Sequence, residues 1–274
     1  MATDVIPESA ASSSTDAGSK PAAKRLHNRR FLAIYLLLGV AIGAAAVGIV
    51  VAFEATTSPS AAWSGWRPSE GGISGARQIA EHVAPSYRLP SGRQLVAVIT
   101  KTPSVSATSQ TGATETIPVP ILAVRGPQSA GGDQVLDISS GNAVMFQLCG
   151  LGPACAIATG APSVDRGRLV RREILELALY TFKYIPGIDD VLAFMPPRLG
   201  TKPKYVVFFR RGDLSTELRS PLVDTLQAKV PTASTIPATE ANAVDAATNP
   251  RYYSFALTQE QLGAPILVLT PASV

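Results

Sequence analysis

The fold is decided by residues 141–211, which read GNAVMFQLCGLGPACAIATGAPSVDRGRLVRREILELALYTFKYIPGIDDVLAFMPPRLGTKPKYVVFFRR. An apolar run at 142–149 opens this stretch and predicts a strand. A long helix pattern follows, and two more apolar runs occupy 189–197 and 204–211. Because these two runs do not alternate with polar residues, they are typical of strands covered on both faces. The loop between them is short enough for an antiparallel pair. The stretch therefore predicts the core of a folded domain.

Both cysteines of the chain, Cys149 and Cys155, lie in the segment CGLGPAC that follows the first strand. The glycines and the proline between them make a short loop easy to close, and outside the cytoplasm such a pair usually forms a disulfide. Free thiols and a redox pair are the alternatives. A redox pair usually has the shorter C-x-x-C spacing, and a zinc site needs four ligands that the neighbouring sequence does not supply. We therefore predict a structural disulfide.

The helix pattern covers residues 164–185. Ser163 is a suitable N-cap before it, and Pro186-Gly187 ends the helix. Successive residues lie 100° apart around a helix, and this gathers the apolar side chains on one broad face. Arg172 and Glu176 fall on the opposite side, where they can form an i, i+4 ion pair. We predict that this polar face, Glu173 included, is solvated and balanced in charge rather than catalytic.

The N-terminal part of the chain has a different composition. Residues 1–30 are rich in Ser, Ala, Thr and Pro and carry five basic against three acidic residues, which predicts a disordered basic tail. Phe31 to Phe53 is a run of 23 residues without a charge. A helix of this length spans about 35 Å, enough to cross a hydrocarbon core of about 30 Å. Because the run is longer than the apolar region of a cleaved signal peptide, we predict an uncleaved transmembrane helix at 31–53.

The flanks of this segment predict its orientation. Five Lys or Arg residues precede it, and Arg67 is the first basic residue after it. The positive-inside rule places the tail in the cytoplasm and the C-terminal bulk outside the cytoplasmic membrane. We predict a linker at 54–72 and one extracytoplasmic domain at 73–274. Gly39 and Gly43 form a G-x-x-x-G pattern in the span, which favours close packing of two helices and indicates a homodimer as one arrangement.

The rest of the predicted domain supplies further elements. In chain order these are a short helix within 73–90, a strand at 93–100, a polar loop at 101–116, strands within 117–126 and 131–140, a helix at 220–229, a low-complexity loop at 231–250 and a hairpin of 251–260 with 264–271. Together they predict an α+β domain whose mainly antiparallel sheet is packed by the helix at 164–185. In Arg211-Gly212-Asp213 we expect a strand end, with Asp213 capping the following turn rather than serving in adhesion.

Charge and motifs exclude several function classes. The net charge of +4 is not gathered into a basic stripe with aromatic residues, so no nucleic-acid interface is expected. The sequence contains no phosphate-binding loop, dinucleotide fingerprint, nucleophile elbow or zinc-protease motif, and no cofactor or metal is predicted. His82 is the only histidine of the predicted domain and is assigned to a helix surface. Asp189 and Asp190 follow a Pro-Gly pair and are assigned to a turn.

Four segments carry a resemblance to a known group of proteins. They are CGLGPAC at 149–155, RLVRREILELALYTFKYIPGIDDVLAFMPPR at 168–198, YVVFFRRGDL at 205–214 and SFALTQEQLGAPILVLTP at 254–271. On these segments the chain resembles uncharacterised single-pass membrane proteins of actinobacterial type, in which a basic tail and one anchor precede a similar extracytoplasmic domain. The resemblance implies an envelope setting, and it implies no activity and no functional residues.

The sequence favours a non-catalytic, membrane-anchored binding or scaffold protein of the cell envelope. Its expected partners are the lipid bilayer, through residues 31–53, and an envelope protein or an anionic polymer. Residues 166–219 hold 11 Lys or Arg against six Asp or Glu, which favours a scattered, solvated surface over the alternative of a basic face that meets anionic lipid head groups or a cell-wall polymer.

Two alternatives stay open. One is a sensor that signals through dimerisation of the anchor. The other is an envelope hydrolase or transferase that uses Asp or Glu side chains. That enzyme would need a deep pocket that gathers two or more of the following residues: His82, Glu173, Glu176, Asp189 and Asp190.

Overall fold

The computed structural model describes residues 62–108, 114–126, 132–259 and 263–273. They belong to one compact unit that begins at Ala61. The predicted span at 31–53, with Gly39 and Gly43, lies outside the described residues. Within the described ranges, no helix is long and apolar enough to cross a membrane.

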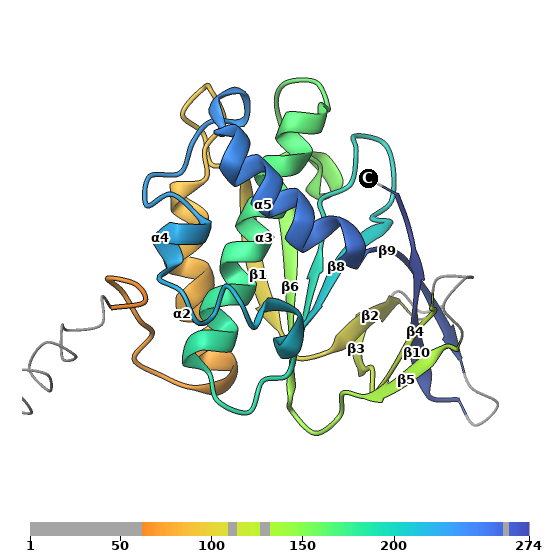
Figure 1. Ribbon diagram of the computed structural model, residues 1–274. Helices are drawn as coiled ribbons and strands as arrows, with labels where there is room; N and C mark the ends of the chain where they lie inside the picture. The colour runs from red at the N-terminus through yellow and green to blue at the C-terminus, as the bar shows by residue number, and fades with distance from the viewer. Residues whose placement is uncertain (1–61, 109–113, 127–131, 260–262, 274) are drawn as a thin grey trace, which may run out of the picture. The chain divides into compact units, whose positions relative to one another are not determined.

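An eight-stranded sheet forms the centre of this unit (Figure 1). Its strands, in spatial order, are β1 (Val96–Lys101), β6 (Ala143–Gly150), β7 (Asp190–Phe194), β8 (Tyr205–Arg210), β9 (Tyr252–Gln259), β10 (Pro265–Pro271), β4 (Ile121–Val124) and β5 (Gln134–Asp137). Neighbours are antiparallel except for two parallel pairs, β6 with β7 and β10 with β4. The predicted α+β fold with a mainly antiparallel sheet is confirmed.

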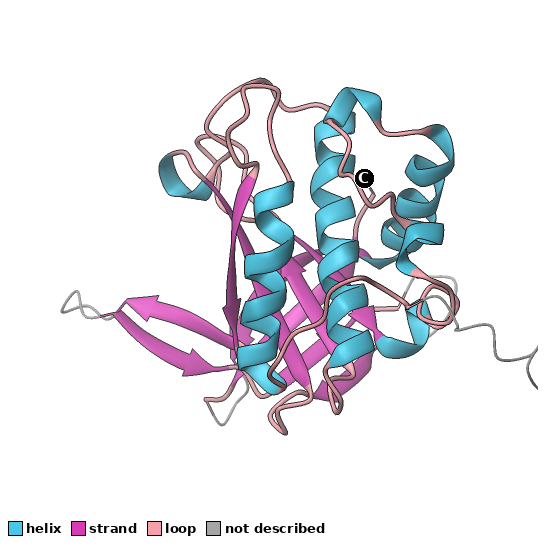
Figure 2. Ribbon diagram, turned by 90° about the vertical axis from the view of Figure 1, so that its left-hand side faces the viewer, coloured by secondary structure: helices cyan, strands magenta, loops and turns pink. Residues whose placement is uncertain are grey.

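Four α-helices accompany the sheet in the described part of the chain. They are α2 (Gly72–Val83), α3 (Val164–Tyr184), α4 (Leu222–Thr225) and α5 (Ala238–Thr248). Figure 2 shows α2, α3 and α5 on one face of the sheet. α3 contacts both α2 and α5 and begins as predicted, with the Arg166 backbone N–H donating to the Ser163 hydroxyl over 3.2 Å. The cap satisfies one of the free N–H groups at the helix start.

The sheet buries apolar side chains on both faces, as the non-alternating runs of β7 and β8 predict. Val191, Val207 and Phe209 belong to the core under the helices. Leu192 and Phe208 belong to a second core, which the strands β4 and β10 complete with Leu122, Leu267 and other apolar residues. Because alternate residues of one strand enter different cores, β7 and β8 are fixed in register by packing on both sides.

Two segments predicted as loops contain regular structure, and those predictions were wrong. The polar segment 101–116 forms most of a two-stranded ribbon of β2 (Ser104–Thr108) and β3 (Thr114–Pro118). The low-complexity segment 231–250 contains α5, because alanine-rich sequence favours a helix once a neighbouring surface can pack against it. In contrast, the helix predicted at 220–229 is only the single turn α4.

The segment predicted as a linker at 54–72 is described from residue 62, and Trp63 lies in the core under the helices. Its side chain is buried, its indole N–H donates to the Glu217 carbonyl over 3.4 Å, and its ring meets Tyr180 edge-on. Trp66 stacks on His82 with ring centroids 3.9 Å apart. The chain therefore packs against the domain before α2 begins.

The predicted disulfide between Cys149 and Cys155 is present, with the Cα atoms 4.4 Å apart. It joins the end of β6 to a 3-10 turn at Pro153–Cys155. Gly150 lies so close to the returning chain that a Cβ there would meet the backbone of Ala156 at 2.3 Å. The glycine thus permits the close approach that the disulfide fastens.

Candidate functional site

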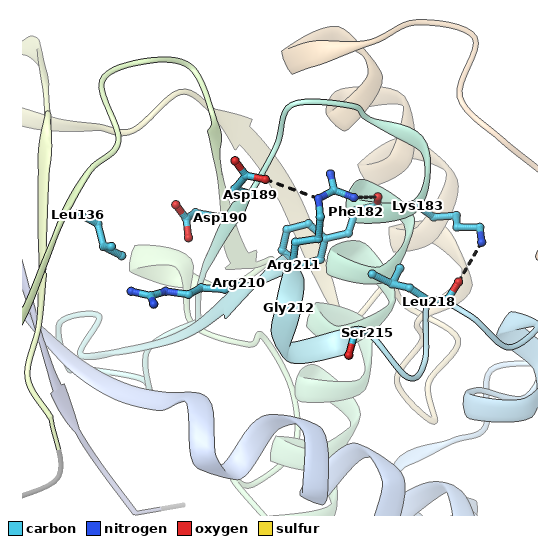
Figure 3. A pocket seen from close by; sticks show the side chains of 10 residues that line it. All are labelled: Leu136, Phe182, Lys183, Asp189, Asp190, Arg210, Arg211, Gly212, Ser215 and Leu218. Carbon is cyan, nitrogen blue, oxygen red and sulfur yellow. Dashed lines mark hydrogen bonds and ion pairs between the residues drawn. The ribbon is translucent and has the colours of Figure 1, made fainter. Parts of the chain in front are cut away.

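A surface hollow of about 800 Å³ lies where the C-terminal end of α3 meets the start of β7 and the end of β8 (Figure 3). The polar and charged side chains that line it come from four segments: Lys183, Asp189, Asp190, Arg210, Arg211 and Ser215. β7 and β8 are antiparallel, and their register places Asp190 directly opposite Arg210. The two residues therefore lie at the same end of two central strands that are adjacent in sequence.

Arg211 is one of the residues that line the hollow. Its guanidinium donates to the carbonyls of Ile185 and Ile188, at 3.1 and 2.6 Å, and also to that of Phe182. It lies 3.7 Å from the Asp189 carboxylate. The guanidinium N–H groups thus satisfy free carbonyls at and beyond the C-terminal end of α3. The positive charge of Arg211 is also favoured there by the helix dipole. Arg211 is a structural group, with its donors turned inward.

Asp213 has a structural role as well. It accepts a hydrogen bond from the Arg210 backbone N–H over 2.8 Å and pairs with Arg251 over 3.1 Å. This agrees with the cap predicted at the end of β8. Both charged side chains of the Arg-Gly-Asp tripeptide are therefore held by contacts inside the domain.

Asp190 and Arg210 differ from these anchored groups. Asp190 is only 7% exposed, and Figure 3 shows no hydrogen bond or ion pair joining it to another residue of the hollow. Burial raises the pKa of the Asp190 carboxyl, while the charge of Arg210 acts in the opposite direction. The Arg210 guanidinium lies over the Phe208 ring at 5.9 Å, and in Figure 3 it points toward the Leu136 side of the hollow, as Asp190 does.

The charged strip of α3 is buried, contrary to the prediction of a solvated face. Arg172 and Glu173 are fully buried, and Glu176 is largely so. The strip is covered by α5, which lies in the segment predicted as a loop, and by the chain around Gln227, which was predicted as part of a helix. Arg172 pairs with Glu240 of α5 at 2.6 Å and with Glu176 at 3.1 Å, which confirms the predicted i, i+4 pair.

Arg172 also contacts two connecting segments, one at Gln227 and one at Tyr87. It donates to the Gln227 carbonyl over 2.8 Å and contacts the Tyr87 hydroxyl, which in turn lies 2.6 Å from the Glu176 carboxylate. A second set of ion pairs joins α3 to α5, because Arg168 and Arg171 of α3 each lie 2.9 Å from the Asp245 carboxylate of α5. Burial by itself would raise the pKa of the Asp245 carboxyl. The hydrogen bond from Arg168 and the positive charges of Arg171 and Arg168 outweigh this effect and hold the pKa below its ordinary value. These contacts fasten α5 to α3.

Glu173 stands apart in this network because neither of its carboxyl oxygens has a hydrogen-bond partner among the described residues. Burial, and then the charge of Glu176, raise the pKa of Glu173 well above its ordinary value, although Arg172 acts in the opposite direction. Between the ordinary and the raised pKa, the folded protein keeps a proton that the unfolded chain has lost. The contribution of Glu173 to stability therefore falls as the pH rises through this window.

Glu173→Gln is expected to raise the free energy of unfolding by about 1–2 kcal/mol at pH 8, because the amide has a similar shape and cannot ionise. At pH 4 the gain is expected to shrink, since the unfolded carboxyl is then mostly protonated too. Thermal unfolding followed by circular dichroism at both pH values measures the difference. Glu81→Gln, on the exposed side of α2, is the matched control. A gain of equal size at both pH values would contradict the assigned role of Glu173.

Two of the five residues that an enzyme would need share the hollow, and the other three lie elsewhere. Asp189 and Asp190 line the hollow. Glu173 and Glu176 belong to the buried network around Arg172. His82 is exposed on α2 against Trp66, and burial lowers its pKa. In the described ranges, no three metal-ligating side chains gather into a group that could hold an ion.

The sequence did not predict that Asp190 lies directly opposite Arg210. The antiparallel pair was predicted, and its short loop already implied which residues lie opposite each other. Asp190 was instead assigned to the turn before the strand. Comparison of the chain with protein-family models, with curated proteins and with solved structures found no match. The function is therefore argued from the chemistry of the hollow and from the sequence.

Proposed function

We propose that the protein is a binding module of the cell envelope, anchored in the cytoplasmic membrane by residues 31–53 with the folded domain on the extracytoplasmic side. The observation that carries the binding role is the hollow, where Asp190 and Arg210 present opposite charges at one end of the central strands β7 and β8. The uncharged run at 31–53 and the basic residues before it support the location. The disulfide adds support, since disulfides persist in oxidising compartments.

The geometry of the hollow favours binding over hydrolysis. Carboxylates that share acid and base work face each other across the reacting bond. In Figure 3 the Asp189 carboxylate is directed toward Arg211, whereas the Asp190 carboxylate points away from the Asp189 carboxylate. No particular contact therefore favours the alternative of an Asp- or Glu-dependent hydrolase or transferase.

The proposed partners are components of the envelope. A protein or a polymer would reach the hollow from the surface, and the bilayer would hold the predicted anchor. Dimerisation through Gly39 and Gly43 would place two hollows on one assembly and is compatible with either kind of partner.

A photo-crosslinking side chain placed at Ser215, in the hollow, tests the binding role in intact cells. Ser215 is exposed and lines the hollow, so a bound partner would form an adduct there. The same side chain at Val223, which is 62% exposed and is not part of the hollow, is the matched control. The proposal expects an adduct at Ser215 that Val223 does not give. Identical adducts at both positions, or none at Ser215, would contradict it.

A further inference from the structure

We propose that the hollow binds the end groups of an amino acid or a short peptide, with Asp190 accepting hydrogen bonds from an ammonium group and Arg210 donating to a carboxylate. This inference rests on the proposed binding function and names its ligand class. It follows from three features of the hollow: the register of β7 with β8, the burial of Asp190, and the engagement of the other charged side chains.

The register brings the two groups together without pairing them. Residues directly opposite each other in an antiparallel pair have Cβ atoms about 4.5–5.5 Å apart and side chains on the same face. Opposite charges at such positions commonly form an ion pair. Asp190 and Arg210 are directly opposite, yet no hydrogen bond or ion pair joins them in Figure 3. Each group is therefore open to a ligand atom of opposite charge.

The carboxyl group of Asp190 is free to accept hydrogen bonds from a cationic ligand. More than nine-tenths of this residue is buried, and no hydrogen bond from the described residues reaches its carboxyl group in Figure 3. Its carboxyl oxygens are not among the buried side-chain atoms of the described residues that lack a partner, so they stay open to the hollow. An ammonium group there would donate the charge-assisted hydrogen bonds that the described residues do not supply.

The other charged residues of the hollow are already engaged. Arg211 donates to main-chain carbonyls and approaches Asp189. Lys183 donates to the Leu218 carbonyl over 2.9 Å and lies over the Trp63 ring at 5.5 Å. The pair of opposite charges left for a ligand is therefore Asp190 with Arg210.

Ligands of a single charge fit this pair less well. A phosphate or another anion at Arg210 would meet the negative charge of Asp190 nearby. A divalent cation at Asp190 would meet the guanidinium of Arg210, and Asp189 is turned toward Arg211 instead of toward its neighbour. A molecule with both a cationic nitrogen and a carboxylate satisfies the two groups at once.

The dipeptide Ala-Ala is the probe, because its methyl side chains add little to the end groups. Binding to the full chain in mild detergent is measured by isothermal titration calorimetry at pH 7. We expect saturable binding of Ala-Ala, and about a tenfold or greater loss for N-acetyl-Ala-Ala and for Ala-Ala amide, each of which lacks one charge. Asp190→Asn should remove the preference for the free amine alone, and Arg210→Gln the preference for the free carboxylate alone.

The matched controls are Asp133→Asn and Arg125→Gln, which change exposed charges that do not line the hollow and should leave binding unchanged. Thermal unfolding of each variant establishes that it is folded. Equal binding of the free and blocked dipeptides, or no saturable binding of Ala-Ala, would overturn the inference. If an adduct at Ser215 still formed in cells, the binding function would stand with another ligand. Ala-Ala binding as expected without a Ser215 adduct would count against the envelope role and not against the ligand class.

Discussion

Arg172→Met is expected to lower the free energy of unfolding by about 3–5 kcal/mol, the usual loss when one partner of a buried charge pair is removed. Arg172 is fully buried and holds Glu240, Glu176 and the Gln227 carbonyl. Met fills a similar volume but leaves two carboxylates without their cation. Thermal and urea unfolding of the full chain in mild detergent, followed by circular dichroism, measure the loss.

Arg77→Met is the matched control, because Arg77 is an exposed arginine on α2 and its replacement should change the stability by less than about 0.5 kcal/mol. The double variant Arg172→Met with Glu240→Met should recover part of the loss, since both members of the closest pair are then apolar. If Arg172→Met were as mild as Arg77→Met, the network would not fasten the segment from Gln227 to α5.

Removal of the disulfide by Cys149→Ala with Cys155→Ala is expected to cost about 2.4 kcal/mol, the value that the chain-entropy model gives for so short a loop. The two cysteines are six positions apart. The wild-type chain unfolded in the presence of a thiol reductant should match the double variant, because both lose the same covalent link. A reductant effect on the double variant itself would point to another cause. Unchanged stability in the double variant would contradict the role assigned to the disulfide.

The central part of the fold could be predicted because its signals are local and repeated. β7 and β8 are continuous apolar runs, and α3 has both a cap and a clear helical period. Such patterns predict a strand or a helix without knowledge of what lies above them. The disulfide also followed from local spacing together with the predicted compartment.

The burial of the polar strip on α3 could not be predicted in the same way. Whether a polar face is solvated depends on what covers it, and the covering segment includes α5, in which Val244 is the one apolar residue larger than alanine. Its attachment to α3 relies on Arg168, Arg171 and Arg172 pairing with Asp245 and Glu240, at sequence separations near 70. Long-range ion pairs of this kind leave no periodic pattern in either segment.

The candidate site was partly accessible from the sequence. The sheet register that joins Asp190 to Arg210 follows from the hairpin once its loop is known. The engagement of Asp189 and Lys183 by neighbouring groups depends on the end of α3 and on the loop around Leu218, which only the structure brings to the hollow.

The claim that the folded domain lies outside the membrane and the tail inside is tested most directly by labelling in intact cells. The native cysteines are joined to each other, so a single new cysteine reports its own position. We predict that a membrane-impermeant maleimide labels Val223→Cys, at an exposed site of the domain, before lysis. Ser12→Cys, in the basic tail, should be labelled only after lysis. Labelling of Ser12→Cys in intact cells, with Val223→Cys protected until lysis, would contradict the proposed function.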